Sequence, residues 1–307
     1  MRQAELLSAF DEHRGLLVGI AYRLLGSLAD AEDVVQEAWL RWADVDLDTI
    51  TDPRAFLVRV TTRLGLDRLR RIKARREQYV GPWLPEPVLT TPDIAEDVVR
   101  SESISLALIV ILETLSPLER AAFVLREAFD FSHAEIAEVL GRSELAVRQL
   151  TKRARAHVQA RRPRFEANHS VRLNVTERFL AACSNGDLAS LLGVLAPGVT
   201  LINDGGGQKL AARLPVQGAT AVSSFLLSVS RAPTIRRYLG LKAGEPLPAV
   251  RVIISDINGA PGIVLYAGDR PISVLALDIA DCLIQVVRLI SSPDKLSRLG
   301  IAERPIQ

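Results

Sequence analysis

Residues 131–158 read FSHAEIAEVLGRSELAVRQLTKRARAHV, and this stretch decides the architecture of the middle of the chain. Ser132 and Glu135 have the S-x-x-E spacing of a capping box, which predicts that a helix starts at the next residue. Gly141 permits the tight turn that ends this helix, and Ser143 can cap a second helix after the turn. Two short helices joined in this way predict a helix-turn-helix.

The second of these helices is apolar on one side and cationic on the other. Its inner face consists of Ala146, Val147 and Leu150, with Leu145 beside them. Its outer face carries Arg148, Lys152, Arg153 and Arg155. Such a helix suits the major groove of DNA, where phosphates flank the base edges. On this stretch alone, an ordinary helical hairpin with a solvated basic face remains an alternative.

The formal net charge of +2 over 307 residues conceals four segments of alternating sign. Residues 1–52 contain 4 basic and 11 acidic side chains, and residues 77–138 contain 3 basic and 12 acidic ones. Residues 59–76 and 142–164 each contain eight basic side chains against a single acid. Two cationic segments in acidic surroundings indicate two nucleic-acid contacts separated by protein-facing surfaces.

Other features of the composition indicate where the chain works. The only cysteines are Cys183 and Cys282, which favours a reducing cytoplasm. The first residues include acids and lack a signal-peptide core, and the longest apolar run, 104–112, is too short to span a membrane. The four histidines are scattered and show no metal-ligand spacing with the cysteines. We therefore expect a cytoplasmic chain without a membrane segment, a cofactor or a metal site.

The first block of the chain, residues 1–78, predicts three helices from apolar residues at helical spacing. Ser27 can cap the second helix. Asp52, followed by proline, is a start signal for the third. Trp39 and Trp42 lie on the second helix and could pack against the core or against a partner protein; we favour the core because large aromatic side chains are usually buried.

Residues 79–97 contain four prolines, which predicts an extended linker. Trp83 indicates that this linker docks on another part of the protein, although a stray exposed aromatic residue is an equal alternative. Residues 98–165 are predicted to be helical again. Ser116 and Glu119 form a capping box ahead of the helix-turn-helix.

Residues 168–307 predict a third, α+β block. Asn174 can cap a first helix, and a second short helix covers residues 188–195. Five strands follow, and Asn258 with Gly259 is a plausible hairpin turn between two of them. The strand segments are VTLIN, PAVRVIIS, GIVLYA, ISVLALDI and LIQVVRLI. Their curved sheet could enclose a pocket.

Three segments resemble the characteristic regions of extracytoplasmic-function (ECF) sigma factors. Residues 30–43, DAEDVVQEAWLRWA, resemble the RNA-polymerase-binding helix of sigma region 2. Residues 52–71, DPRAFLVRVTTRLGLDRLRR, resemble the helix that reads and melts the −10 promoter element. Residues 115–158 resemble region 4, which reads the −35 element.

Three shorter motifs are similar to the marks of one subgroup of these sigma factors. They are WLPEP at 83–87, DGGG at 204–207 and SPDKL at 292–296, where Ser292 stands in place of an expected Asn. The resemblance implies a multidomain fold with two all-α sigma domains, followed by an α+β SnoaL-like cone domain of the nuclear-transport-factor-2-like fold. It also implies that this C-terminal domain modulates the sigma factor in place of a separate anti-sigma protein.

The resemblance implies a set of site residues. The polymerase-binding set is Asp30, Glu32, Asp33, Gln36 and Glu37. The DNA-binding set is Arg59, Arg63, Arg68, Arg70, Arg71, Arg142, Ser143, Glu144, Arg148, Lys152, Arg153 and Arg155. The interdomain regulatory set is Trp83, Leu84, Pro85, Glu86, Pro87, Asp204, Gly205, Gly206, Gly207, Pro293, Asp294, Lys295 and Leu296.

Two classes of function fit these observations. The favoured one is a promoter-specificity subunit that binds core RNA polymerase and promoter DNA, without enzyme activity. Asp187, Asp204 or Asp278 could serve in catalysis only inside a pocket that perturbs its pKa, so no catalytic residue is expected. The alternative is a DNA-binding regulator whose C-terminal domain binds or converts a small molecule. An unknown small-molecule ligand of that domain remains open under either reading.

Overall fold

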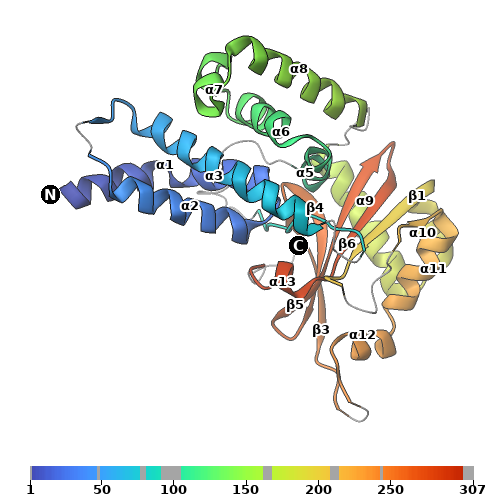
Figure 1. The fold of residues 1–307 in the computed structure, drawn as a ribbon. Coiled ribbons are helices and arrows are strands. Elements are labelled where there is room, and N and C mark those ends of the chain that lie inside the picture. Colours follow the sequence, from blue (N-terminus) through green and yellow to red (C-terminus); the bar gives the residue numbers. More distant parts are fainter. Residues whose placement is uncertain are drawn as a thin grey trace. The chain divides into compact units, whose positions relative to one another are not determined.

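The computed structural model divides the chain into two compact units (Figure 1). Unit 1 comprises Met1–Gln78 and Pro92–Arg162, and unit 2 comprises Tyr79–Thr91 and Pro163–Gln307. The structure describes residues 2–46, 49–76, 81–90, 105–161, 168–207, 214–242 and 245–299. Both ends of the predicted linker, the start of the predicted second block, and the side chains of Arg75 and Arg76 lie outside the described part.

The first half of unit 1 is a bundle of three helices, α1 (Arg2–Leu25), α2 (Leu28–Ala43) and α3 (Pro53–Arg76). The predicted start signals are confirmed: the Ser27 hydroxyl accepts a hydrogen bond from the Asp30 N–H (3.2 Å), and the Asp52 carboxylate accepts one from the Ala55 N–H (3.0 Å). Buried residues at helical spacing on α1 and α3 form the core of the bundle. They include Leu17, Ile20, Leu24, Leu57, Leu64 and Leu69.

The two tryptophans of α2 help to join the bundle together. Trp42 is fully buried, and its indole N–H donates to the carbonyl of Leu6 at 2.8 Å. Trp39 is half-buried and packs edge-to-face against Phe10, with ring centroids 5.0 Å apart. The expectation that both aromatic side chains face the core is confirmed.

The second half of unit 1 contains α5 (Leu106–Glu113), α6 (Pro117–Phe123), a π-helical turn η2 (Val124–Ala128), α7 (His133–Leu140) and α8 (Glu144–Arg161). Both predicted capping boxes are present, at Ser116 with Glu119 and at Ser132 with Glu135. Gly141 ends α7 with a φ of 62°, a left-handed conformation that glycine adopts without strain. The predicted helix-turn-helix is confirmed.

The two halves of unit 1 pack against each other, which the sequence did not predict. Arg63 on α3 donates to the carbonyl of Val139 on α7 at 3.3 Å. Lys73 on α3 donates to the carbonyl of Leu115 at 2.8 Å, and the buried Arg120 on α6 donates to the carbonyl of Arg23 at 2.9 Å. We call these three interactions the unit 1 contact.

Unit 2 is a six-stranded sheet in the order β2-β1-β6-β5-β4-β3, covered on one face by helices. The strands are β1 (Leu195–Asp204), β2 (Val216–Gln217), β3 (Val250–Ile257), β4 (Ala260–Ala267), β5 (Arg270–Ala280) and β6 (Leu283–Ile290). All neighbours are antiparallel except β1 and β6, which are parallel. The helices are α9 (His169–Asn185), α10 (Leu188–Val194), α11 (Ala219–Val229), α12 (Ala232–Tyr238) and α13 (Pro293–Leu296). This α+β architecture agrees with the class that the resemblance to a SnoaL-like domain implied.

The five predicted strands of unit 2 are all present, and Asn258 (φ 51°) and Gly259 (φ 74°) form the predicted turn between β3 and β4. The predicted helix cap at Asn174 is wrong. Asn168 caps α9 through a hydrogen bond from the Val171 N–H at 2.9 Å, so Asn174 lies inside the helix. Helices α11 and α12 were missed: α11 buries Val222 and Leu226 against strands that are distant in the sequence, whereas α12 buries no side chain. No helix in the described ranges is long and apolar enough to cross a membrane.

Candidate functional site

One side of α2 remains exposed after its apolar residues pack against α1 and α3. Asp33, Gln36 and Glu37 from the predicted polymerase-binding set lie on this surface. Leu40 lies one turn further along and is 65% exposed. The sequence interpretation missed Leu40, although the positions 33, 36, 37 and 40 follow helical spacing. The outer surface of α2 therefore carries Asp33 and Glu37, an arginine, Arg41, that pairs with Glu37 at 2.9 Å, and one apolar side chain.

Asp30, at the start of α2, is half-buried and has an internal partner. The guanidinium of Arg68 on α3 donates to Asp30 at 2.8 Å and to Asp33 at 3.0 Å. The hydrogen bond to Asp30 is the main reason why the pKa of Arg68 is raised. Glu32 is half-buried on the same helix. Two residues assigned to different partners by sequence, Asp30 and Arg68, thus also bind each other.

The other arginines of α3 differ in their surroundings. Arg63 is held in the unit 1 contact, and Arg70 forms an exposed ion pair with Asp67 at 2.6 Å. The guanidinium of Arg59 lies 5.6 Å from the ring centre of Phe56, while Arg71 is exposed. The helix thus presents cations on a solvated side and anchors one of them against α7.

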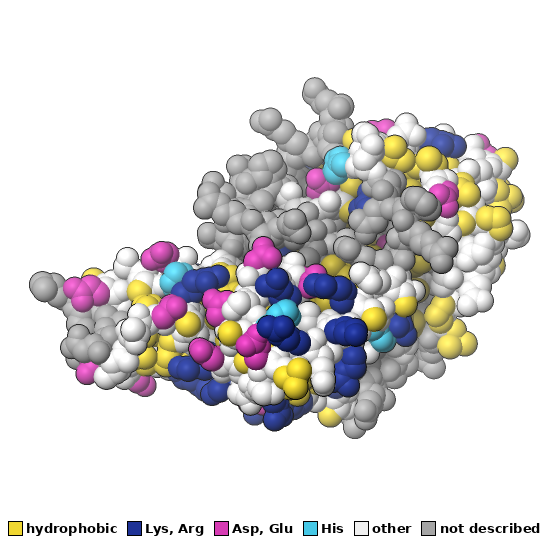
Figure 2. Space-filling model, turned by 90° about the horizontal axis from the view of Figure 1, so that it is seen from above, with side chains coloured by type: hydrophobic (Ala, Val, Ile, Leu, Met, Phe, Trp, Pro, Cys, Tyr) yellow, Lys and Arg dark blue, Asp and Glu magenta, His cyan; other side chains and the backbone are white. Residues whose placement is uncertain are grey.

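The second helix of the helix-turn-helix exposes its cationic face (Figure 2). Arg148 and Lys152 are both exposed and lie four residues apart, while Val147 and Leu150 are buried. Leu145 corrects the sequence interpretation: it is 68% exposed instead of packing on the inner face, because it lies at the very start of α8. The cations and their neighbours line a surface hollow formed by Arg126, His133, Arg148, Thr151, Lys152, Arg155, Ala156 and Gln159.

Ion pairs hold several of these cations in position without burying them. Glu144 accepts from Arg148 at 2.7 Å within α8. Arg155 pairs with Glu127 at 2.6 Å, and Arg153 lies 3.5 Å from Glu119. Exposed pairs of this kind are worth little in stability, so phosphate can replace the carboxylates at small cost. Arg142 is exposed, and Ser143 caps α8 by accepting from the Ala146 N–H at 3.3 Å.

The proline-rich segment 81–90 belongs to unit 2, where it packs as an extended strand-like segment. The N–H of Leu84 donates to the carboxylate of Asp204 at 2.7 Å, and the ammonium of Lys295 donates both to the carbonyl of Leu84 and to Asp204. The same ammonium lies 4.3 Å from the ring centre of Trp83, a cation–π contact. We call Trp83, Leu84, Asp204 and Lys295 the linker clamp.

A second set of contacts holds the other end of the segment. The N–H of Val88 donates to the side-chain carbonyl of Asn258 at 3.1 Å, and the N–H of Asn258 donates back to the Val88 carbonyl at 2.8 Å. The Thr90 N–H donates to the carbonyl of Asp256 at 2.9 Å. Prolines 85 and 87 have no N–H that would need a partner inside the protein. The segment from Leu84 to Val88 is buried throughout, so it is a structural part of unit 2.

The glycine-rich loop after β1 shapes the clamp. Asp204 is fully buried, and its carboxylate also accepts from the Gly206 N–H at 3.1 Å. Gly206 has a φ of 66°, and a Cβ there would lie 2.7 Å from the hydroxyl of Ser292. Ser292 is buried and precedes α13, which carries Lys295. The DGGG and SPDKL motifs therefore lie in direct contact: Gly206 of the first faces Ser292 of the second, and Lys295 donates to Asp204.

The three acids considered for catalysis all have structural partners. Asp187 caps α10 by accepting from the Ser190 N–H at 3.1 Å, and its pKa is lowered chiefly by the Ser190 hydroxyl. Asp278 pairs with Arg288 across β5 and β6, and Asp204 is the carboxylate of the linker clamp. Within the described residues, no cluster of three or more metal-binding side chains exists.

Comparison with known proteins supports the assignment of the segments. The family described as Sigma-70 region 2 matches residues 9–76, and the family described as Sigma-70, region 4 matches residues 105–158. The chain is 40% identical to the ECF RNA polymerase sigma factor SigJ of Mycobacterium tuberculosis, over 98% of this chain and 96% of that protein. It is 33% identical to a probable ECF RNA polymerase sigma factor, SigI, of the same organism, over 95% of each. The crystal structure of M. tuberculosis SigJ superposes with a TM-score of 0.73, at 37% identity, over 96% of this chain and 99% of that one.

Proposed function

The chain belongs to the family of extracytoplasmic-function RNA polymerase sigma factors, and on that premise we propose that its C-terminal unit controls the sigma regions through the linker clamp. Sigma factors are transcription initiation proteins and not enzymes. They bind core RNA polymerase and promoter DNA. In this chain, separate surfaces of unit 1 carry side chains suited to these two partners: an acidic surface on α2, and cationic ones on α3 and α8.

We infer that core RNA polymerase binds the outer surface of α2. The exposed Gln36, Glu37 and Leu40 support this assignment, because an acidic helix surface with one apolar side chain is of no use against DNA but suits a basic protein surface. Asp33 belongs to the same surface, with Arg68 as its internal partner, and Asp30 and Glu32 support it from the half-buried side.

Charge reversal at one position on α2 and at one on α1 tests whether polymerase binds this surface or responds only to the net charge of the protein. Glu37→Lys should weaken co-purification with core RNA polymerase, whereas Glu12→Lys, an exposed acid on α1, should not. Leu40→Ser should weaken binding as well, because it removes the apolar contact. Equal binding by the Glu37 and Leu40 variants and the native chain would contradict the assignment.

We assign the −35 contact to the cationic face of α8 and the −10 contact to the arginines of α3. The two elements are roughly 25 base pairs apart, which is about 85 Å along B-DNA. Within unit 1, however, α3 and α7 touch through Arg63 and Val139. One molecule cannot read both elements while this contact exists. The unit 1 contact therefore belongs to a closed state, and binding to a promoter requires the two halves to separate.

The observation that carries the regulatory proposal is the linker clamp itself. Residues 81–90 connect the two sigma regions in the sequence, yet they are held by a buried carboxylate and a lysine of the C-terminal unit. A linker fixed at both ends limits how far the two regions can separate, while a released linker leaves them free. The occupancy of the clamp thus biases the closed and open states of the sigma regions.

In vitro transcription with core RNA polymerase tests the proposal. The template is a promoter recovered by selecting genomic fragments with the assembled holoenzyme. Lys295→Met removes the ammonium of the clamp and should change promoter output. Arg251→Met removes an exposed ion pair with Asp269 in the same unit and should leave output unchanged. Equal output from the Lys295 variant, the Arg251 variant and the native chain would leave the C-terminal unit without a regulatory role.

We propose four segments for the working protein: sigma region 2 at 1–78, a linker at 79–97, sigma region 4 at 98–165 and the SnoaL-like domain at 168–307. The family matches at 9–76 and 105–158 support the sigma segments. The packing of 81–90 in unit 2 supports grouping this part of the linker with the C-terminal domain. Since RNA polymerase acts in the cytoplasm, we propose that the protein works there.

A further inference from the structure

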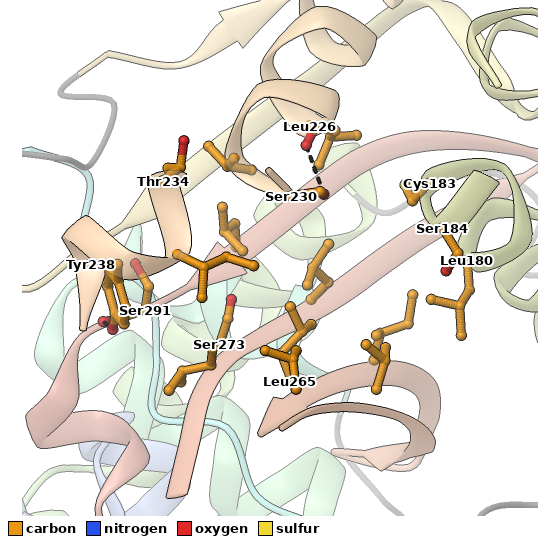
Figure 3. A pocket seen from close by; sticks show the side chains of 18 of the residues that line it. Leu180, Cys183, Ser184, Leu226, Ser230, Thr234, Tyr238, Leu265, Ser273 and Ser291 are labelled. Atoms are coloured by element: carbon orange, nitrogen blue, oxygen red, sulfur yellow. Dashed lines mark hydrogen bonds between the residues drawn. The ribbon is translucent and has the colours of Figure 1, made fainter. Parts of the chain in front are cut away.

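Unit 2 has a partly open cavity of about 280 Å³ between the sheet and helices α9, α11 and α12 (Figure 3). Its walls are mostly apolar, with side chains contributed by Phe179, Leu226, Ile263, Leu265, Leu275 and Leu289. A cavity of this size, lined by hydrocarbon with a few polar groups, is near the small end of the range of ligand-binding pockets, roughly 300–1,000 Å³.

The polar groups of the cavity are uncharged, and they come from Ser184, Asn203, Ser230, Thr234, Tyr238, Ser273 and Ser291. The hydroxyl of Ser273 on β5 is buried, has no hydrogen-bond partner, and points into the cavity (Figure 3). Tyr238 donates its hydroxyl to the carbonyl of Ser291, and Ser230 donates to the carbonyl of Leu226 at 2.9 Å. Burial raises the pKa of the Cys183 thiol to about 12, so this group is neutral at physiological pH. None of the described residues that line the cavity is charged.

We propose that this cavity is a binding site for an uncharged, largely hydrocarbon molecule of one or two rings with one hydroxyl or carbonyl group, which regulates the linker clamp. The apolar walls select the hydrocarbon, and the unpartnered Ser273 hydroxyl selects the polar end. An unsatisfied buried hydroxyl carries a desolvation penalty that a ligand acceptor or donor removes. A charged ligand is rejected because the lining offers no countercharge.

The cavity and the linker clamp share two backbone segments. Asn203 lines the cavity, and the next residue of β1, Asp204, holds Leu84 of the linker. Neighbouring strand residues point to opposite faces, which accounts for this division. Ser291 also lines the cavity, and its N–H donates to the Asp204 carbonyl at 2.8 Å. A molecule that packs against Asn203 and Ser291 therefore stiffens the backbone that positions Asp204.

The binding part of this inference stands alone, while its regulatory part rests on the proposed function of the clamp. The test uses the full-length protein and 2-naphthol, an uncharged two-ring molecule with one hydroxyl. With about eleven non-hydrogen atoms, it should bind saturably with a Kd of about 1 mM or tighter, as seen by calorimetry. The matched charged molecule, 2-naphthalenesulfonate, should not bind. Absence of saturable 2-naphthol binding, or equal binding of the sulfonate, overturns the proposal.

Two variants locate the bound molecule. Ser273→Ala should weaken 2-naphthol binding about 3- to 10-fold, through loss of one hydrogen bond, without lowering the thermal midpoint. A purely structural role of Ser273 would instead lower the midpoint. Leu265→Trp fills the cavity and should abolish binding while the far-ultraviolet circular dichroism stays native. Full binding by either variant places the molecule elsewhere and overturns the site.

Hydrogen exchange then tests the coupling. Saturating 2-naphthol should slow amide exchange in the peptide that covers residues 81–90, since Leu84 and Val88 donate their N–H groups inside unit 2. The Leu265→Trp variant should show no such change. Unchanged exchange despite binding overturns the coupling. If Lys295→Met alters transcription while 2-naphthol does not bind, the clamp proposal stands and the ligand proposal falls.

Discussion

In unit 2 the linker is held by a buried carboxylate, Asp204, and by Lys295, whereas in unit 1 the two sigma regions are joined by cations that donate to main-chain carbonyls. The two sets of contacts differ in how easily water or DNA phosphate can replace their hydrogen bonds. A buried, hydrogen-bonded ion pair loses several kcal/mol when one partner is removed. Two of the three cations of the unit 1 contact, Arg63 and Lys73, are not buried and can donate to water or phosphate instead, whereas Arg120 is fully buried. We therefore expect Arg63 and Lys73 to exchange their partners more readily than Lys295 of the linker clamp does.

The buried arginines of unit 1 reinforce this contrast. Arg23 is almost fully buried, and burial lowers its pKa to about 10. Its guanidinium lies 4.8 Å from the ring centre of Phe129, while its carbonyl accepts from Arg120. Arg120 is fully buried and pairs with Glu113 at 2.6 Å. Burial of the Arg23 guanidinium costs desolvation, which makes this part of unit 1 less stable than an apolar contact of the same size.

The largest expected effect comes from breaking the clamp. Asp204→Ala leaves the Leu84 N–H and the Lys295 ammonium without their shared acceptor, so the stability of unit 2 should fall by about 3–5 kcal/mol. The thermal midpoint and the exchange rate of the Leu84 amide measure this loss. As a control, Asp269→Ala removes an exposed partner of Arg251 and should change stability by less than about 1 kcal/mol. Equal losses of stability in the two variants would mean that the buried Asp204 contributes no more than the exposed Asp269.

The glycine loop gives a smaller effect with an internal control. Gly206→Ala meets a positive φ and a 2.7 Å approach to Ser292, so it should destabilise unit 2 by about 2–3 kcal/mol. Gly207→Ala has a φ of 79° but no atom within 4 Å of its Cβ, so about 1 kcal/mol is expected. Chemical denaturation compares the two variants. A larger loss at Gly207 would contradict the close approach of the two motifs.

Replacing a buried cation in unit 1 should act in the opposite direction. Arg23→Met keeps most of the side-chain volume and removes the desolvation penalty, so unit 1 should be unchanged or stabilised by about 1–2 kcal/mol. A more stable closed state should bind core RNA polymerase more weakly. Thermal unfolding and co-purification with core enzyme measure the two effects. A clear loss of stability would show that the arginine supports the contact and does not weaken it.

The cationic face of α8 should affect DNA binding and leave stability alone. Arg148→Ala should cost about 1–3 kcal/mol of promoter affinity and relax base specificity if Arg148 reads a base. Lys152→Ala should weaken binding to all sequences alike and reduce the salt slope by about 0.9, as expected for one lost phosphate contact. Footprinting and salt titration on promoter and unrelated DNA separate the two roles. Arg41→Ala on α2, outside the DNA surface, is the matched control and should behave like the native chain.

The smallest expected effect is a pH dependence at the start of α7. Hydrogen bonds from the Ser132 hydroxyl and N–H lower the pKa of Glu135, so its contribution to stability is present above the unfolded pKa of about 4.3 and is lost as the pH falls through the lower folded value. Ser132→Ala removes the main cause of this shift and costs about 0.5–2 kcal/mol at neutral pH. Unfolding measured between pH 7 and pH 3 should then show a flatter acid limb. If the free energy of unfolding falls equally steeply with acid in the variant and the native chain, the capping box is not the cause of the pH dependence.

Local sequence signals predicted the helical elements of unit 1 well. Capping boxes, an Asp-Pro start and a helix-ending glycine act within a few residues, so Ser116, Ser132, Asp52 and Gly141 could be read directly. The five long strands of unit 2 and the turn at Asn258 followed from the same kind of local pattern. The start of α9 was misplaced because Asn168 and Asn174 both precede helical residues, and only the Val171 N–H selects the first.

Sequence by itself determined the order of the sigma segments, the cationic face of α8 and the motifs that later meet in the clamp, because each is encoded by neighbouring residues. Tertiary structure alone decided that Arg68 binds Asp30, that Arg63 reaches Val139, and that Asp204 and Lys295 close on Leu84. These partners are 38 to 211 residues apart in the chain. No periodicity or spacing records such a pairing, since it depends on how packed helices and a curved sheet bring distant side chains within hydrogen-bonding distance.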